Sequence, residues 1–495
     1  MKSTRCIALL LMALTSSAQK SRIIAPRIWD DNAVEDWATP VAALGVRPNQ
    51  FTAAEYYAVP GENLRTYPVY RPDREPRGYW EWLQEQKPQP LVDAAKLRTR
   101  EDWIQAGAIA FQTMGARGLR TSDPEKIRLY RDPKAFDGIW TRTDGSLLVD
   151  RWVVTDHGIE LRATACAGCH ARARADGTVF WGAPQGPTPA GTHDVTLLPL
   201  TAPTPADDEP RGIRTWRLFT VPWAQDERIE KLRDAPNAAA LISAMQGARV
   251  PGVLSRPHGN PYYQTKIPDL NNLQYSRYLD ATATHRLRGP EDVARYAAFI
   301  TGVDPMEFGK YKILKPEQRR IRFRYADEVL YAIGIYLMSL EPPKNPGLVP
   351  ASLIVRGRQI FARETCINCH VPPNYTSGKL TLAEGYRPPP DHPSQADIVN
   401  ISVGTDPGLA MKTRKGTGFY KIPSLRGVWY RLLLLHDGSV ASLEEMFDPY
   451  RLKPDHVPGG WIGPGVTNRA IPGHPFGLAL NTEDKAALLA FLRSL

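Results

Sequence analysis

Two short stretches of the sequence combine side chains that could do chemistry. Residues 166–170 read Cys-Ala-Gly-Cys-His, and residues 366–370 read Cys-Ile-Asn-Cys-His. Two thiols followed at once by an imidazole could bind zinc, form a redox-active dithiol or attach haem. A zinc site needs four ligands, and each stretch supplies only three, with no second Cys-x-x-Cys beside it. A redox dithiol needs a strand-to-helix context and does not account for a histidine placed identically twice.

Covalent attachment of haem accounts for every residue of both stretches. Two cysteines one helical turn apart can form thioethers with the two vinyl groups of a porphyrin, and the next residue brings its imidazole to the iron. The sequence therefore predicts two covalently bound c-type haems, with His170 and His370 as iron ligands. The expected cofactor-binding residues are Cys166, Cys169, His170, Cys366, Cys369 and His370.

The N-terminus has the pattern of a secretory signal. A basic start precedes the apolar residues 6–14, and small residues end at Ala18, after which a signal peptidase could cut. The apolar run is too short for a bilayer, which needs about 20 residues, and no later stretch is long and apolar enough. We expect residues 1–18 to be a signal peptide and the mature protein to be exported, to the periplasm in a Gram-negative cell. The fifth cysteine, Cys6, lies within this signal.

Length and charge limit the classes of function. The 495 residues are enough for two or three domains. The chain has 62 Lys and Arg against 52 Asp and Glu, an excess that the haem propionates would partly offset. This mild positive balance indicates a solvated surface or docking of an acidic redox partner protein, the electron donor or acceptor. Nucleic acid is not an expected partner because the chain has no concentrated basic run.

The two halves of the chain repeat each other before each haem motif. Gly107 and Phe111 have the same spacing as Gly357 and Phe361, which lie on one face of a predicted helix at residues 351–364. A small glycine on one helix lets an aromatic residue of another helix pack closely against it. The predicted partner is a terminal helix, "DKAALLAFLRSL", with Asn481 or Thr482 as its cap.

The halves also repeat each other after the haem motifs. "KIPDLNNL" at 266–273 corresponds to "KIPSLRGV" at 421–428, and a histidine and an acidic helix start follow each of them. The closing helices end alike, in "YLMSL" at 336–340 and "FLRSL" at 491–495. Features shared in one order predict a degenerate duplication, and the paired helices resemble the crossed terminal helices of class I cytochromes c. This resemblance implies a mainly α fold of two cytochrome c-like helical domains with long irregular loops.

The halves differ by an insertion in the first one. "SLLVDRWVV" and "HGIELRATA", between Phe111 and Cys166, predict a small β-rich insertion. Prolines at 341–352 predict a semi-rigid linker between the halves. The expected order is a signal peptide (1–18), an irregular N-terminal arm (19–90), a first haem domain with the insertion (91–340), the linker (341–352) and a second haem domain (353–495).

These motifs resemble those of the bacterial di-haem cytochrome c peroxidase superfamily, which includes the di-haem enzyme that matures methylamine dehydrogenase. The resemblance rests on "GRQIFARETCINCH", "YKIPSLRGVWYRLLLLHDGSVASLEEMF" and the terminal helix. The stretch "RAIPGHPFGLALNTEDKAALLAFL" is also similar to the di-haem rubber oxygenases. The resemblance implies two haems near a domain interface, with one iron reactive and the other passing electrons.

Distal ligands decide whether an iron can react, because six protein ligands leave no position for peroxide or dioxygen. The candidates at the second haem are His474, His436, Met446, Tyr450 and Met411. The peroxidase resemblance places Tyr450 where those enzymes have a methionine ligand, whereas the rubber-oxygenase resemblance favours His474, which we expect to be the third iron-binding histidine. The candidates at the first haem are His285, His258, His193 and Met245, and no motif selects among them.

The expected function is that of a peroxidase-like oxidoreductase with electron transfer between its two haems. Hydrogen peroxide or dioxygen would react at the more accessible N-terminal haem. Two alternatives remain open on the sequence: a non-catalytic periplasmic electron carrier with both irons closed, and a haem oxygenase acting on an organic substrate. The sequence identifies no catalytic residue beyond the haem ligands.

Overall fold

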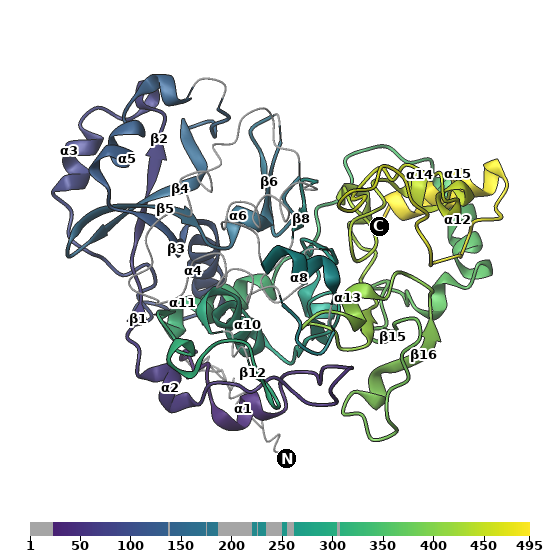
Figure 1. Ribbon diagram of the computed structural model, residues 1–495. Coiled ribbons are helices and arrows are strands. Elements are labelled where there is room, and N and C mark those ends of the chain that lie inside the picture. Colours follow the sequence, from purple (N-terminus) through teal and green to yellow (C-terminus); the bar gives the residue numbers. More distant parts are fainter. Residues whose placement is uncertain are drawn as a thin grey trace, which may run out of the picture.

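The computed structural model describes residues 23–136, 139–174, 176–186, 220–224, 226–233, 250–254, 262–303 and 307–495 (Figure 1). The predicted signal peptide lies outside these residues. The helices are α1 (Asp31–Glu35), α2 (Ala53–Tyr57), α3 (Tyr79–Gln84), α4 (Arg100–Thr113), α5 (Pro124–Leu129), α6 (Ala167–His170), α8 (Glu227–Arg233), α10 (Pro290–Gly302), α11 (Asp327–Leu337), α12 (Ala351–Arg363), α13 (Gly408–Met411), α14 (Leu443–Met446) and α15 (Thr482–Arg493). Short 3-10 turns include η6 (Cys366–Asn368), η8 (Val428–Tyr430) and η9 (Pro449–Leu452).

Most strands belong to small sheets. The strands are β1 (Gly61–Glu62), β2 (Thr66–Tyr70), β3 (Gly115–Thr121), β4 (Ser146–Thr155), β5 (Gly158–Thr164), β6 (Ala171–Ala173), β7 (Val179–Trp181), β8 (Val253–Leu254), β9 (Thr265–Lys266), β10 (Tyr278–Leu279), β11 (His285–Arg286), β12 (Glu307–Phe308), β13 (Tyr311–Lys312), β14 (Arg324–Tyr325), β15 (Leu380–Leu382), β16 (Ile398–Ser402) and β17 (Phe419–Lys421). Two sheets have more than two strands among the described residues: β2-β4-β5-β3 and β16-β15-β17.

Helix α4 crosses helix α11 in close contact at Gly107. A Cβ atom added there would lie 2.0 Å from the carbonyl oxygen of Ala332 and 2.7 Å from Cβ of Tyr336. Any side chain larger than hydrogen would therefore force the two helices apart. One turn further along α4, Phe111 packs against Tyr336, with ring centroids 5.5 Å apart.

Helix α12 crosses helix α15 in the same way at Gly357. A Cβ atom there would lie 2.1 Å from the carbonyl oxygen of Ala487 and 2.6 Å from Cβ of Phe491. The ring of Phe361 packs against Phe491 at 5.4 Å between centroids. The side chain of Asn481 caps α15, as predicted. The two helix pairs are thus built alike, whereas their origin by duplication stays a prediction.

The predicted β-rich insertion forms an antiparallel sheet with a strand from the N-terminal segment. β4 and β5, which correspond to the two predicted stretches, form a hairpin, and β2 pairs with the other edge of β4. Trp152 of β4 is fully buried and packs on Trp80 of helix α3. Because helices and sheets share the chain, the predicted mainly α class is confirmed only in part, and the described fold is mixed.

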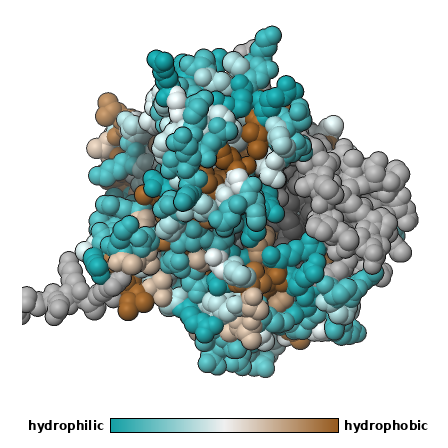
Figure 2. Space-filling model, turned by 90° about the vertical axis from the view of Figure 1, so that its left-hand side faces the viewer, coloured by the Kyte–Doolittle hydropathy of each residue, from teal (hydrophilic) through white to brown (hydrophobic). Residues whose placement is uncertain are grey.

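The elements lie in three groups (Figure 1). The four-stranded sheet lies on the left of the view with α3 and α5, helices α4, α10 and α11 lie near the centre, and α12, α14 and α15 lie on the right. Figure 2 shows the side that carries the sheet, where hydrophilic residues dominate and hydrophobic ones form small separate groups. No helix of the described residues has both the length and the apolar character needed to cross a membrane.

The segment predicted as an irregular arm is an ordered part of the first core. Its buried side chains join the cluster formed by helices α4, α10 and α11. The largest are Ile28, Trp29, Trp37, Phe51 and Tyr56. Residues 61–70 also supply strands β1 and β2, which pair with β14 and β4. The N-terminal segment therefore stabilises the first half by burying aromatic surface, although the domain boundaries themselves stay predictions.

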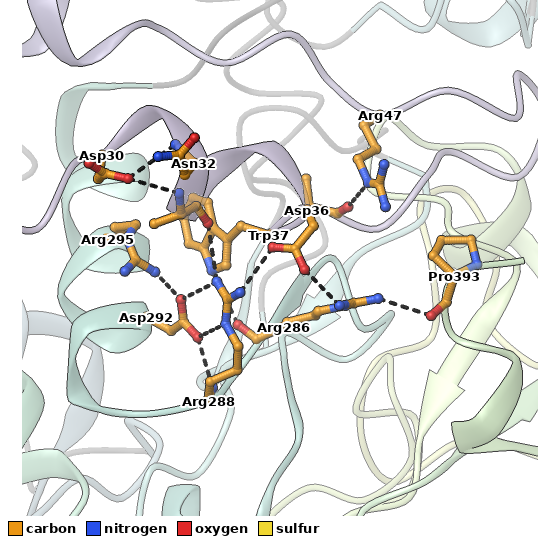
Figure 3. A network of polar contacts seen from close by, with 12 residues as sticks. Asp30, Asn32, Asp36, Trp37, Arg47, Arg286, Arg288, Asp292, Arg295 and Pro393 are labelled. Atoms are coloured by element: carbon orange, nitrogen blue, oxygen red, sulfur yellow. Dashed lines mark hydrogen bonds and ion pairs between the residues drawn. The ribbon is translucent and has the colours of Figure 1, made fainter.

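A polar network fixes this segment to both halves of the chain (Figure 3). The carboxylate of Asp36 accepts hydrogen bonds from Arg286 at 2.8 Å and from Arg288 at 2.9 Å. Arg288 also pairs with the buried Asp292 at 2.9 Å. Arg286 in turn donates to the carbonyl oxygen of Pro393, at 2.9 Å, in the second half. Exposed ion pairs contribute little each, about 0–1 kcal/mol, so the network specifies orientation more than it adds stability.

The glycine crossing gives the first testable prediction. Gly357→Ala would place a methyl group 2.1 Å from the carbonyl oxygen of Ala487, and overpacking of this kind costs about 1–3 kcal/mol. We expect urea denaturation followed by circular dichroism to show this loss. Val355→Ala, at an exposed position of the same helix, should change stability by less than about 0.5 kcal/mol. Equal stability of the two variants would contradict the close crossing.

Candidate functional site

Both Cys-x-x-Cys-His stretches fold as a single tight helical turn. The amide of His170 donates to the carbonyl oxygen of Cys166 at 3.0 Å, and the amide of His370 donates to that of Cys366 at 2.9 Å. In the second half, Thr365 adopts a left-handed φ of 59° directly after α12, which starts the new turn. Both turns therefore hold two thiols and an imidazole at the spacing that the sequence predicts.

A backbone carbonyl orients each of the two histidines. The Nδ1 atom of His170 lies 3.2 Å from the carbonyl oxygen of Pro268, and that of His370 lies 3.1 Å from the carbonyl oxygen of Tyr375. The carbonyl of Pro423 also hydrogen-bonds the His370 ring. Since a carbonyl only accepts, Nδ1 carries the proton and Nε2 keeps its lone pair, which is the tautomer that binds a metal. Pro268 and Pro423 occupy the same position in the two repeated Lys-Ile-Pro segments.

The second motif lies on the wall of a cavity. Cys366, Cys369 and His370 line it, together with side chains of α12, α14 and α15. The cavity holds about 290 Å³, at the lower end of the range for cofactor pockets, about 300–1,000 Å³. Its apolar walls include Phe361, Leu435, Met446, Phe447, Leu488 and Leu492. Two thiols, an imidazole and an apolar wall are the groups that a c-type haem requires.

His474 lines the same cavity as His370. Its Nδ1 atom is buried and has no hydrogen-bond partner among the described residues. Burial lowers the pKa of His474 to about 4, and the nearby His370 ring contributes in the same direction. The imidazole is therefore neutral, with a buried polar nitrogen that protein groups do not satisfy. A neutral imidazole on the cavity wall can bind a metal ion through a nitrogen lone pair.

The loop that carries His474 is held by a buried arginine. His474 and Gly473 both have positive φ, of 49° and 86°. The guanidinium of Arg451 is fully buried and donates to the carbonyl oxygens of Met446, Ile471, Gly473 and His474 at 2.7–3.0 Å. The backbone amide of His474 donates to Val403 at 2.6 Å. These bonds fix an otherwise strained backbone and thereby the position of the imidazole.

The four other candidate ligands can be placed relative to this cavity. His436 lines it, but packs against Tyr420, with ring centroids 4.4 Å apart and the ring planes tilted by 34°. Met446 also lines it and is buried. Tyr450 lies outside the lining, and its half-exposed hydroxyl donates to Asp455 at 2.7 Å. Met411, at the end of α13, is not among the lining residues either.

Of the candidate ligands for the first Cys-x-x-Cys-His stretch, His285 is the one that lies among the described residues. His285 of β11 is buried against Trp37, with ring centroids 4.1 Å apart, and against Phe299 at 4.8 Å. Its Nδ1 atom lies 3.0 Å from the hydroxyl of Thr284. His285 therefore belongs to an aromatic cluster. The remaining candidates, His193, Met245 and His258, lie outside the described residues.

The sequence did not identify three cations that line the cavity, Lys266, Lys421 and Arg431. Arg431 pairs with the buried carboxylate of Asp269 at 2.9 Å. The two lysines begin the repeated Lys-Ile-Pro segments, and this repetition was the sequence feature that could have identified them as site residues. Arg451 likewise left no signal, because its role depends on a loop that lies 20 positions further along the chain.

Comparisons with known proteins give limited information. No family model matches the sequence, and no curated protein matches it. Solved structures that overlay on parts of the chain include hydrazine synthase from Kuenenia stuttgartiensis, which is 12% identical and matches over 58% of this chain and 88% of the other, with a TM-score of 0.28. A MauG-like protein associated with microbial copper homeostasis is 19% identical over 59% of this chain and 91% of the other, with a TM-score of 0.29.

A third overlay is the diheme peroxidase BthA from Burkholderia thailandensis E264. It is 19% identical over 51% of this chain and 76% of the other, with a TM-score of 0.26. At TM-scores this low, the likeness does not establish a shared fold or reaction.

The role of Arg451 can be tested by its removal. Arg451→Met would leave four buried carbonyl oxygens without their charged donor, and we expect a loss of about 2–4 kcal/mol in the free energy of unfolding. Urea denaturation measures this loss. Arg387→Met, which removes an exposed arginine, is the matched control and should change stability by less than about 0.5 kcal/mol. A similar result for both variants would show that Arg451 does not hold the His474 loop.

Proposed function

We propose that this protein is an exported di-haem c-type cytochrome that acts as a peroxidase-like oxidoreductase. One haem would be attached to Cys166 and Cys169, and the other to Cys366 and Cys369. The observation that carries the proposal is the cavity that Cys366, Cys369, His370 and His474 line together. Thioether attachment and two imidazoles would account for each of these polar groups in an apolar pocket.

The residues of the chain would hold and tune the cofactor. His370 is the proximal ligand, and its Nδ1 proton, held by the carbonyl of Tyr375, keeps Nε2 available. His474 is the proposed distal ligand, positioned by Arg451. A haem with two imidazole ligands supplies one-electron transfer at a potential set by its ligands and surroundings. The apolar wall from α15 would exclude water from this haem and restrict it to electron transfer.

The first haem is the proposed reactive one. His170 would be its proximal ligand, oriented by the carbonyl of Pro268. The best-described candidate for a distal ligand, His285, is packed within an aromatic cluster. An iron with an open position can bind peroxide or dioxygen, and the second haem would deliver electrons from a partner protein. The position of Pro268 supports electron transfer between the two sites, because its carbonyl oxygen lies 3.2 Å from Nδ1 of His170 and the same residue lines the second cavity.

The proposal predicts that one of the two haems binds external ligands. We expect the half-reduced protein to bind cyanide or peroxide at one haem per chain, and the reduced protein to bind carbon monoxide, all followed by absorbance changes of the haem. If neither the ferric nor the half-reduced protein binds any of them, both irons are closed and the protein is an electron carrier. Turnover of an organic substrate with dioxygen would instead favour an oxygenase.

His474→Ala should convert the second haem from low-spin to high-spin, because it removes one of two strong-field nitrogen ligands. Electron paramagnetic resonance measures the spin state, and the first haem's signal should stay unchanged. Both this variant and the control His157→Ala, at an exposed hairpin turn, should retain two haems per chain by mass. A spectrum of His474→Ala identical to that of the wild type would exclude His474 as a ligand, and Met446 or His436 would then be the next to test.

A further inference from the structure

Two partly buried lysines line the cavity without a carboxylate partner within ion-pair distance among the described residues. The ammonium group of Lys266 donates to the carbonyl oxygen of Leu433 at 3.2 Å, and that of Lys421 donates to the carbonyl oxygen of Tyr278 at 3.3 Å. Among the described residues, neither lysine forms an ion pair within 4.0 Å, in contrast to Lys415, which pairs with Asp280 at 3.2 Å. Burial lowers the pKa of both lysines to about 8.

The carboxylates near these lysines are already engaged. Asp269 accepts from Arg431 at 2.9 Å and from Tyr430 at 2.6 Å. Asp437 pairs with Arg469 at 2.9 Å. Carboxylates of the protein thus balance the charges of Arg431 and Arg469. The charges of Lys266 and Lys421 at the cavity wall have no such partner among the described residues. A buried charge that lacks a counter-ion is strongly unfavourable, so such a pair predicts a bound anion of matching charge.

The two lysines come from different halves and act on one another. Lys266 ends β9 in the first half, and Lys421 ends β17 in the second. Arg431 and Lys421 both lower the pKa of Lys266 by repulsion, so the three cations lie close enough to repel. The amide of Lys266 donates to the carbonyl oxygen of His436 at 3.0 Å, which fixes β9 against the second half. The anion site therefore lies where the two halves meet.

We propose that Lys266 and Lys421 bind the two propionate groups of the haem attached at Cys366 and Cys369. The inference rests on the proposed function and adds the polar end of the cofactor site to it. Two ammonium groups match two carboxylates in charge, and charge-assisted hydrogen bonds would replace the weaker bonds to carbonyl oxygens. Because one lysine belongs to each half, cofactor binding would also fix the halves relative to each other.

The reduction potential of the second haem tests this assignment. A propionate charge favours ferric iron, and a paired lysine opposes that effect. Lys266→Met and Lys421→Met should therefore each shift the midpoint potential of this haem to lower values in a spectroelectrochemical titration. Lys→Arg at either position keeps the positive charge and should leave the potential close to the wild-type value. The propionate bands in the reduced-minus-oxidised infrared difference spectrum should move in the Met variants and return in the Arg variants.

The matched control is Lys453→Met, which removes an exposed lysine outside the cavity lining and should leave both potentials unchanged. Unshifted potentials and infrared bands in both cavity variants, with two haems per chain, would overturn the assignment but leave the proposed function intact. Absence of haem from the wild type would instead remove the proposed function itself.

A free anion is the other source of a carboxylate, and the wild type alone distinguishes it. If the propionates occupy the lysines, added acetate should leave the potential and the absorbance of the second haem unchanged. A saturable response to acetate that Lys266→Met abolishes would show that the lysines hold an exchangeable anion, and the assignment to the propionates would be wrong.

Discussion

The contact between helices α12 and α15 determines where the second site can form. Gly357 lets the backbones approach until a Cβ atom would clash with Ala487, and this places Leu488 and Leu492 of α15 on the wall of the cavity. The Cys-x-x-Cys-His turn begins directly after α12, so the same helix presents its thiols and imidazole to that wall. A shift of either helix would separate the apolar wall of the cavity from the thiols and the imidazole of the Cys-x-x-Cys-His turn.

The cavity combines groups that would be costly to bury on their own. A neutral histidine has a buried nitrogen without a partner, and two lysines lack ion pairs within the described residues. Both arrangements cost free energy unless another group satisfies them. They become favourable together if one amphipathic cofactor satisfies them, with iron at the imidazoles and carboxylates at the lysines. The proposed haem therefore accounts for the cavity as a whole.

Local patterns allowed much of the second half to be predicted. The spacing of Gly357 and Phe361 within one helix predicted the crossing with the terminal helix, and Asn481 was one of two predicted caps, because both patterns can be read within a few residues. The placement of His474 on the cavity agrees with its selection as a candidate, although its ligation stays a prediction. The outward orientation of Tyr450 could not be predicted, since it depends on a hydrogen bond to Asp455.

Other features depend on contacts distant in sequence. The N-terminal segment has no regular pattern, and its order comes from partners such as Arg286, which lies 250 positions from Asp36. Lys266 and Lys421 are partly buried on the cavity wall, whereas lysine is usually exposed, so composition alone did not indicate their position. The sheet was predicted only in part, because β2 joins β4 from outside the insertion.

X-ray diffraction at the iron absorption edge tests the central claim most directly. Crystals of the mature protein should give two iron peaks in the anomalous difference map, one of them between the rings of His370 and His474 and the other beside His170. A single peak, or a second-half peak with His474 turned away from it, would contradict the account of this cavity as a haem site closed by two histidines.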